Sequence, residues 1–231
     1  MATFVLVPGM CHGAWSFETL VEPLRRHGHR VYALTLTGVA ERAHLLTSTV
    51  NLDTHIQDVV GVLEAEAIED AVLVGHSYGG MVITGVADRV PRRVDSLVYL
   101  DALVPEDGDS VFGLVPAEGD WYLGVGETGY AIPPLPFFDP RATDHPLASA
   151  LQRIRLTGDL SRFRSRTYVY ATESEWEGGS PFASLYERLR KDPRWSVHAL
   201  AGKHNLMRDV PDDLVKILLV TAGAGRGELD E

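Results

Sequence analysis

Short apolar runs alternate with amphipathic segments through the first hundred residues of the chain. The runs are rich in β-branched and aromatic residues and read TFVLV (3–7), RVYAL (30–34), AVLVG (71–75) and VDSLVYLDA (94–102). Apolar residues recur at helical spacing in the segments between and after them, at 15–28, 52–67 and 80–91. Strands that are apolar throughout are buried on both faces, so this pattern predicts an α/β fold, a mostly parallel sheet with helices on both faces.

The alternation stops between residues 103 and 163, where Pro, Gly and aromatic residues are dense. A long insertion of this kind in a compact domain is typically a lid or a binding loop. Strand and helix patterns then return in turn at 166–172, 182–191, 195–200 and 212–223. We therefore expect a single α/β domain over residues 1–231, with a lid inserted at about 103–163 and a solvated tail at about 223–231.

The sequence also predicts where one helix begins. Asp53 is placed to be the N-cap of the helix at 52–67.

Charge and composition exclude several classes of partner. A formal net charge of −11 disfavours binding to nucleic acid and to anionic membranes. No apolar stretch reaches the roughly 18 residues that a membrane-spanning helix needs, and a single cysteine, Cys11, allows no internal disulfide. The first apolar run has no basic region before it and is broken at Pro8, which indicates a strand and not a signal peptide. We predict a cytoplasmic protein with no nucleic acid or membrane partner.

The stretch VLVGHSYGGM, residues 72–81, contains the pattern G-x-S-x-G from Gly75 to Gly79. The pattern follows a predicted buried strand and precedes a predicted helix, which is the setting of a nucleophile elbow. A side chain at either glycine would crowd the neighbouring strand or helix. Ser77 is therefore the candidate nucleophile.

A serine hydroxyl needs a base within hydrogen-bond reach and a group that orients that base. Three histidines follow Ser77: His145 in the predicted lid, His198 within a predicted strand, and His204 in the loop after that strand. His204 is the candidate base, because a loop at the end of a late strand can reach the elbow.

Two positions compete for the acid of the triad. Asp101 closes the apolar run VDSLVYLD, where a lone charge is costly unless it is paired or catalytic. Glu173 and Glu175 follow the next strand, where serine hydrolases of this kind more often carry the acid. We place the acid at Asp101 and keep Glu173 or Glu175, and a dyad without an acid, as alternatives.

Backbone N–H groups must also stabilise the oxyanion of acyl transfer. The candidates are Tyr78, directly after the nucleophile, and Met10, in the turn after the first strand. Cys11 is interpreted as small packing and not as a second nucleophile, and His12 either lines the pocket or holds the turn. No Cys/His set has metal-ligand spacing and no phosphate-binding loop is present, so we expect neither a metal nor another cofactor.

The chain resembles the α/β-hydrolase superfamily through FVLVPGMCHGAWSFETLVEPLRRHGHRVYALTLTG, VLVGHSYGGMVI, LVYLDALVPEDG and GKHNLM. More narrowly, it is similar to the branch of plant methylesterases of the salicylic-acid-binding type, hydroxynitrile lyases and bacterial esterases of the pyrethroid-hydrolase type. Two positions depart from that branch: Pro8 precedes Gly9 where the family has His-Gly, and Ser174 follows Glu173 where plant members have the catalytic aspartate. The second departure favours Asp101, because lipases resembling the pancreatic enzyme carry their acid one strand earlier.

Together, the residues and the resemblance predict a cofactor-free serine hydrolase that cleaves a carboxylic ester, such as a methyl or aryl ester, of a small hydrophobic substrate. The aromatic lid favours an uncharged or aromatic substrate. One alternative is a lyase or cyclase with His204 as general base, for which Lys203 is the best-placed pocket lysine. The other alternative is a ligand-binding, receptor-like protein with slow turnover.

Overall fold

The computed structural model describes residues 1–158, 160–176 and 178–223. Its centre is a six-stranded sheet in which every neighbouring pair is parallel, in the order β2-β1-β3-β4-β7-β8. The strands are β1 (Thr3–Val7), β2 (Arg30–Ala33), β3 (Ala71–His76), β4 (Val94–Leu100), β7 (Ser165–Ala171) and β8 (Ser196–Leu200). Their bounds differ from the predicted ones by at most two residues. The predicted α/β class with a parallel sheet is confirmed.

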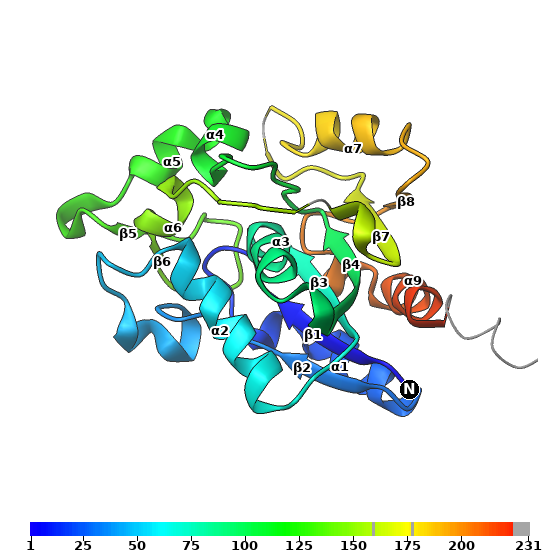
Figure 1. Cartoon of the computed structure of the whole chain (residues 1–231). Coiled ribbons are helices and arrows are strands. Elements are labelled where there is room, and N and C mark those ends of the chain that lie inside the picture. The colour runs from blue at the N-terminus through cyan, green and yellow to red at the C-terminus, as the bar shows by residue number, and fades with distance from the viewer. Residues whose placement is uncertain (159, 177, 224–231) are drawn as a thin grey trace, which may run out of the picture.

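Helices cover both faces of the sheet. α2 (Leu52–Ala65) and α3 (Gly79–Arg89) pack on one face, in front of the strands in Figure 1, and α1 (Glu18–Arg26) and α9 (Pro211–Gly223) pack together on the other. The side chains of β3 alternate between these layers: Leu73 belongs to the core under α2 and α3, and Val72 to the core under α1 and α9. This burial on both faces explains why the strands are apolar throughout.

Asn51, and not Asp53, is the N-cap of α2. The Asn51 side chain accepts a hydrogen bond from the Thr54 N–H (3.0 Å), and the Thr54 hydroxyl accepts one from the Asn51 N–H (3.3 Å). This reciprocal capping box satisfies two donors of the first turn. The prediction for Asp53 is wrong by two residues; Asp53 lies in the first turn and pairs with Arg89.

The inserted segment, residues 103–163, is built from short elements. They are α4 (Val111–Leu114), α5 (Gly119–Leu123), α6 (Leu147–Leu151) and an antiparallel pair, β5 (Ala131–Ile132) and β6 (His145–Pro146). Figure 1 shows these elements gathered on the side of the molecule away from β2 and the N-terminus. α7 (Ala183–Leu189) follows β7, and α8 (Leu206–Asp209) precedes α9.

Two predictions concern the chain ends and membranes. α9 continues to Gly223, so most of the predicted tail, residues 224–231, lies outside the described residues. Of the helices in the described part of the chain, none combines the length and apolar character that crossing a membrane requires.

Candidate active site

Ser77 lies in the tight turn between β3, which ends at His76, and α3, which begins at Gly79. Its φ of +54° is in the left-handed region, a strained conformation that non-glycine residues adopt mainly where function requires it. A Cβ at Gly75 would lie 2.6 Å from the Gly79 carbonyl oxygen, and one at Gly79 would lie 2.4 Å from the Val7 carbonyl oxygen. The predicted steric requirement for both glycines is therefore confirmed.

The structure brings His204 and Asp101 together. Asp101 follows β4 directly, with a φ of +41°, and its Oδ2 lies 2.7 Å from Nδ1 of His204. Asp101 Oδ1 accepts a second hydrogen bond, from the Ala171 N–H (3.2 Å). Both side chains are buried, at 1% and 6% exposure for Asp101 and His204. Because Nδ1 donates its proton to the carboxylate, Nε2 of the neutral imidazole is the nitrogen left to accept a proton.

The alternative acids lie elsewhere. Glu173 is exposed, and Glu175 pairs at 3.8 Å with Lys203, whose side chain is half exposed. Lys203 does not line the pocket at Ser77. Within the described residues, neither glutamate is therefore hydrogen-bonded to His204, and no lysine lines the pocket where a hydroxynitrile lyase would use one.

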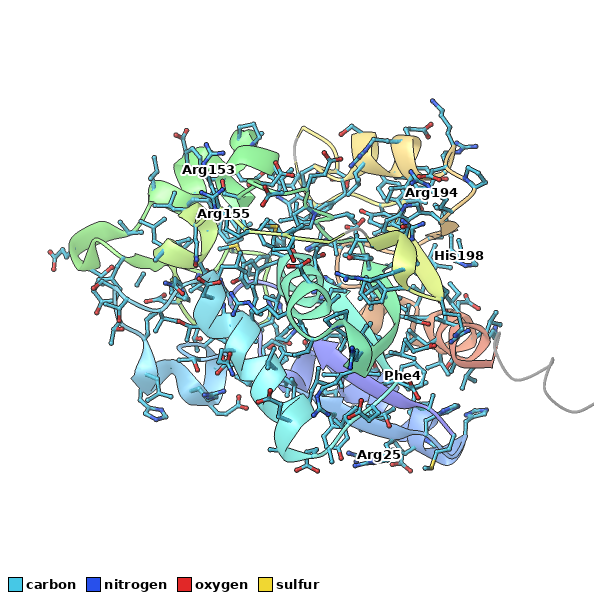
Figure 2. The ribbon with its side chains drawn as sticks, in the orientation of Figure 1. Phe4, Arg25, Arg153, Arg155, Arg194 and His198 are labelled. Atoms are coloured by element: carbon cyan, nitrogen blue, oxygen red, sulfur yellow. The ribbon has the colours of Figure 1, made fainter. Side chains whose placement is uncertain are left out.

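Two other histidines, His198 and His76, make hydrogen bonds outside the pair formed by His204 and Asp101. His198 lies on β8, 3.0 Å from the Ser196 hydroxyl, and Figure 2 shows it at the outer edge of the molecule. His76 donates from Nε2 to the carbonyl oxygen of His204 (2.9 Å). That bond supports the loop carrying His204, so His76 acts as scaffolding of the elbow.

Burial sets the protonation of the buried pair. It lowers the pKa of His204 and raises the pKa of Asp101, because a charged group loses solvation in the interior. His204 is thus a neutral imidazole at neutral pH, which is the form that can accept a proton from Ser77.

The pH dependence of hydrolysis follows from the direction of the His204 shift. Protonated His204 cannot act as base, so activity falls as the pH drops through the pKa of the imidazole. Since that pKa is lowered, we expect the acid limb of kcat/KM to have its midpoint below the ordinary histidine value of 6.5. Rates measured from about pH 4 to pH 9, with circular dichroism at each pH to exclude unfolding, check this. A midpoint at or above 6.5 would contradict it.

Two backbone N–H groups border Ser77 without an internal partner. Among the described residues, we find no acceptor for the N–H of Met10 or of Tyr78. Both residues line the pocket with Ser77 and His204, and Tyr78 is the N-cap of α3, where the helix dipole favours negative charge. The next N–H along the first loop, that of Cys11, is already used by His145.

A two-bond clamp holds the loop that carries Met10. Cys11, at a φ of +68°, donates from its N–H to His145 Nδ1 (3.2 Å) and accepts at its carbonyl from the Thr143 N–H (3.1 Å). The Ser149 hydroxyl donates to the Pro146 carbonyl (2.8 Å), so it accepts from His145 Nε2 (3.0 Å). This arrangement fixes the tautomer of His145 with Nδ1 as acceptor. His145 thereby ties the inserted segment to the loop beside the nucleophile, a role that the sequence reasoning missed.

A similar buried bond lies behind the second candidate donor. Tyr78 donates from its hydroxyl to His55 Nδ1 (2.7 Å), because His55 Nε2 donates to the Thr37 carbonyl (2.8 Å). His55 and Tyr78 are almost completely buried. Buried histidines thus anchor Tyr78 itself, through His55, and the loop that carries Met10, through the bond from Cys11 to His145.

His145→Phe is expected to lower kcat for ester hydrolysis by about 10- to 100-fold with a smaller change in KM. Phenylalanine cannot accept the Cys11 N–H, and a shift of the loop by a fraction of an ångström misplaces the Met10 donor. The matched control is His198→Phe, at a histidine on the outer edge of the sheet. Steady-state kinetics and melting temperatures of both variants check this. A lowered melting temperature with unchanged kcat would mean that His145 acts on stability alone.

The pocket in front of Ser77 is lined mainly by aromatic and aliphatic side chains. The inserted segment supplies Leu103, Val111, Val115, Glu118, Trp121, Tyr122 and Phe138, and the stretch after β7 supplies Trp176, Pro181 and Phe182. Such a lining suits a small, largely apolar ligand.

The remaining predictions for the first loop concern His12 and Cys11. His12 lines the pocket and also donates from Nδ1 to the Met10 carbonyl (2.7 Å), so both roles weighed for it apply. Burial raises the pKa of the Cys11 thiol, which keeps it protonated and unreactive. Among the described residues, no group of three or more His, Cys, Asp or Glu side chains is arranged to hold a metal ion.

Comparison with known proteins places these features in context. The model of the alpha/beta hydrolase family matches residues 4–226. The carbendazim hydrolyzing esterase of Nocardioides sp. (strain SG-4G) is 39% identical, over 94% of this chain and 98% of that protein. Salicylic acid-binding protein 2 of Nicotiana tabacum is 32% identical over 62% of this chain and 59% of that protein. An extracellular alpha/beta-hydrolase from a Paenibacillus species shares the fold, with a TM-score of 0.79 at 24% identity over 96% of this chain and 99% of that chain.

Proposed function

Because the chain belongs to the alpha/beta hydrolase family, we propose that its Ser77, His204 and Asp101 cleave a carboxylic ester through an acyl-enzyme. Similarity to an esterase over nearly the whole chain, within this family, makes the protein a carboxylic-ester hydrolase. The observation that carries the assignment of residues is the 2.7 Å contact between His204 Nδ1 and Asp101 Oδ2 beside a serine at positive φ.

The reaction has two steps. In the first, Ser77 Oγ attacks the ester carbonyl while His204 Nε2 takes its proton and then delivers it to the leaving alcohol. Asp101 holds the imidazole in the required tautomer and stabilises its protonated form. In the second, His204 takes a proton from water, which attacks the acyl-enzyme; the Ser77 Oγ–carbon bond breaks, His204 returns the proton to Ser77 Oγ, and the carboxylic acid is released. The N–H groups of Met10 and Tyr78 bind the oxyanion in both steps, and no metal or organic cofactor takes part.

The substrate is a small ester with an aromatic or other apolar portion. The aromatic lining of the pocket supports this class, and a methyl or aryl ester is the simplest member that fits it. The names of two relatives mention small molecules, carbendazim as what one hydrolyses and salicylic acid as what the other binds.

The inserted segment, residues 103–163, acts as a lid on a single α/β domain. Six of its apolar or aromatic residues line the pocket, and its clamp on Cys11 links it to the oxyanion loop. For location we retain the cytoplasm, because a single cysteine, Cys11, is compatible with a reducing compartment. Fractionation of the native host tests this against secretion, since the Paenibacillus neighbour is extracellular.

A panel of methyl and aryl esters of aromatic acids, with mass spectrometry of both products, tests the proposed function. We expect turnover that releases one acid and one alcohol in equal amounts. Cleavage without uptake of water, or cyclisation, would support the lyase or cyclase alternative. Tight binding of an aromatic acid with no turnover of any ester would support the binding-protein alternative.

A further inference from the structure

Arg166 is an unexpected residue in β7. The strand lies inside the sheet, between β4 and β8, and its residues 166–169 are all buried. Side chains two positions apart share a face of a strand, so Arg166 points to the same side as Tyr168, which is completely buried. Only 8% of Arg166 is exposed. A charge in such a position is costly unless another group compensates it.

The described part of the protein gives this guanidinium no carboxylate. Among the described residues, we find no Asp or Glu within ion-pair distance of Arg166 and no acceptor for its side-chain N–H groups. Its Cζ lies 5.2 Å from the centre of the Trp195 ring, a weaker attraction than a buried ion pair. Arg164, two residues earlier, is held by Asp95 through hydrogen bonds of 2.8 and 2.9 Å.

Arg166 lines a cavity between the inserted segment, α7 and the loop before β8, which we call the Arg166 cavity. Figure 2 shows Arg194, another of its lining residues, between α7 and β7. Among the described residues, this cavity and the pocket in front of Ser77 have no lining residue in common. Its apolar lining includes three leucines and one tryptophan, namely Leu156, Leu160, Leu189 and Trp195. The cavity thus combines a buried cation with an apolar wall.

The other charged side chains of the Arg166 cavity already have partners. These are the pairs Glu106–Arg188 (3.2 Å) and Asp192–Arg194 (2.7 Å), and Asp107, which accepts from the Leu156 N–H (2.9 Å). Asp192 is within electrostatic reach of Arg166, but Arg194 is its main partner. Three carboxylates therefore line the cavity with the arginines, and they repel each negative charge that a ligand brings. A ligand with one negative charge is favoured over one with two.

We propose that the Arg166 cavity binds a small aliphatic monocarboxylate, with the carboxylate on the Arg166 guanidinium and the chain against Leu156, Leu160 and Leu189. A guanidinium matches a carboxylate through two parallel hydrogen bonds. A carboxylate carries a single charge at neutral pH, whereas a phosphate monoester carries nearly two. The site is separate from the pocket in front of Ser77, and its occupation does not depend on ester hydrolysis.

Isothermal titration calorimetry with hexanoate and three comparison compounds tests the chemistry of the site. We expect saturable binding of hexanoate to the wild-type protein at neutral pH. 1-Hexanol lacks the charge, acetate lacks the chain, and hexyl phosphate carries additional charge. Each of the three is expected to bind at least about tenfold more weakly than hexanoate.

Variants place the binding in the Arg166 cavity. Arg166→Met is expected to weaken hexanoate binding at least about tenfold without lowering the melting temperature, because it replaces an unpaired buried charge by an apolar chain of similar length. Arg166→Lys keeps the charge but not the planar fork, so we expect intermediate binding. Arg155→Met, at an exposed arginine of the inserted segment, and Trp121→Ala, in the pocket in front of Ser77, are the controls. Both are expected to keep the wild-type affinity within about twofold.

Several results would overturn the proposal. One is the absence of saturable hexanoate binding to the wild-type protein, and another is wild-type affinity in a folded Arg166→Met protein. Affinity that falls in Trp121→Ala but not in Arg166→Met would place the carboxylate in front of Ser77 instead. Tighter binding of hexyl phosphate would refute the preference for a single charge. If Arg166→Met does not fold, Arg166→Lys decides, and unchanged affinity in that variant contradicts the proposal.

Discussion

Ser77→Ala is expected to lower kcat for ester hydrolysis by about 10⁴-fold or more. The residual rate is then the one that the oxyanion donors and substrate binding supply without a nucleophile. Alanine removes the only candidate nucleophile that the described residues place beside His204, since the Cys11 thiol is buried and its pKa is raised. Substrate binding is expected to survive, because the aromatic lining of the pocket is untouched.

Single-turnover and steady-state rates on one aryl ester, with substrate binding measured by fluorescence titration, check this prediction. Ser48→Ala, at an exposed serine outside the pocket, is the matched control. Residual activity within about tenfold of wild type in a folded Ser77→Ala protein would assign the nucleophile elsewhere.

The second large effect is expected for Asp101→Asn, at about 10³- to 10⁴-fold in kcat. The amide retains the shape of the side chain, but its NH₂ group cannot accept the His204 Nδ1–H, which favours the wrong tautomer of the imidazole. The surrounding contacts, including the bond from the Ala171 N–H to Oδ1, can persist through the amide oxygen, so we expect the fold to be retained.

Glu173→Gln and Glu175→Gln are the matched comparisons, because both carry the same charge change after the next strand. We expect each to change kcat by less than about threefold, since Glu173 is exposed and Glu175 faces Lys203. A large loss in either glutamine variant together with a mild effect of Asp101→Asn would move the acid to the later strand.

The sheet and the candidate nucleophile could be predicted because local patterns encode them. Burial on both faces requires the apolar runs of the strands, and the elbow requires glycines at positions 75 and 79, where a Cβ would meet backbone oxygens. Asp101 and His204 could be singled out because each ends a strand or follows one, and parallel strands bring their C-terminal ends to one edge of the sheet.

Other features depend on contacts that no local pattern encodes. His145 meets Cys11 across 134 positions of the chain, and the pocket gathers Glu118 and Trp176 from separate irregular segments. Neither segment has a periodicity that fixes where its side chains point. The misplaced N-cap at Asp53 has a local cause: both Asn51 and Asp53 are good caps, and only the reciprocal bond with Thr54 selects Asn51.

The central claim is that Ser77 is a nucleophile activated by His204, and covalent labelling tests it most directly. The measurement is the intact mass of the protein after incubation with a serine-directed fluorophosphonate, for wild type, Ser77→Ala and Ser48→Ala. The account predicts a single adduct on wild type and Ser48→Ala and none on Ser77→Ala. No adduct on folded wild-type protein, or an adduct that persists in Ser77→Ala, would contradict it.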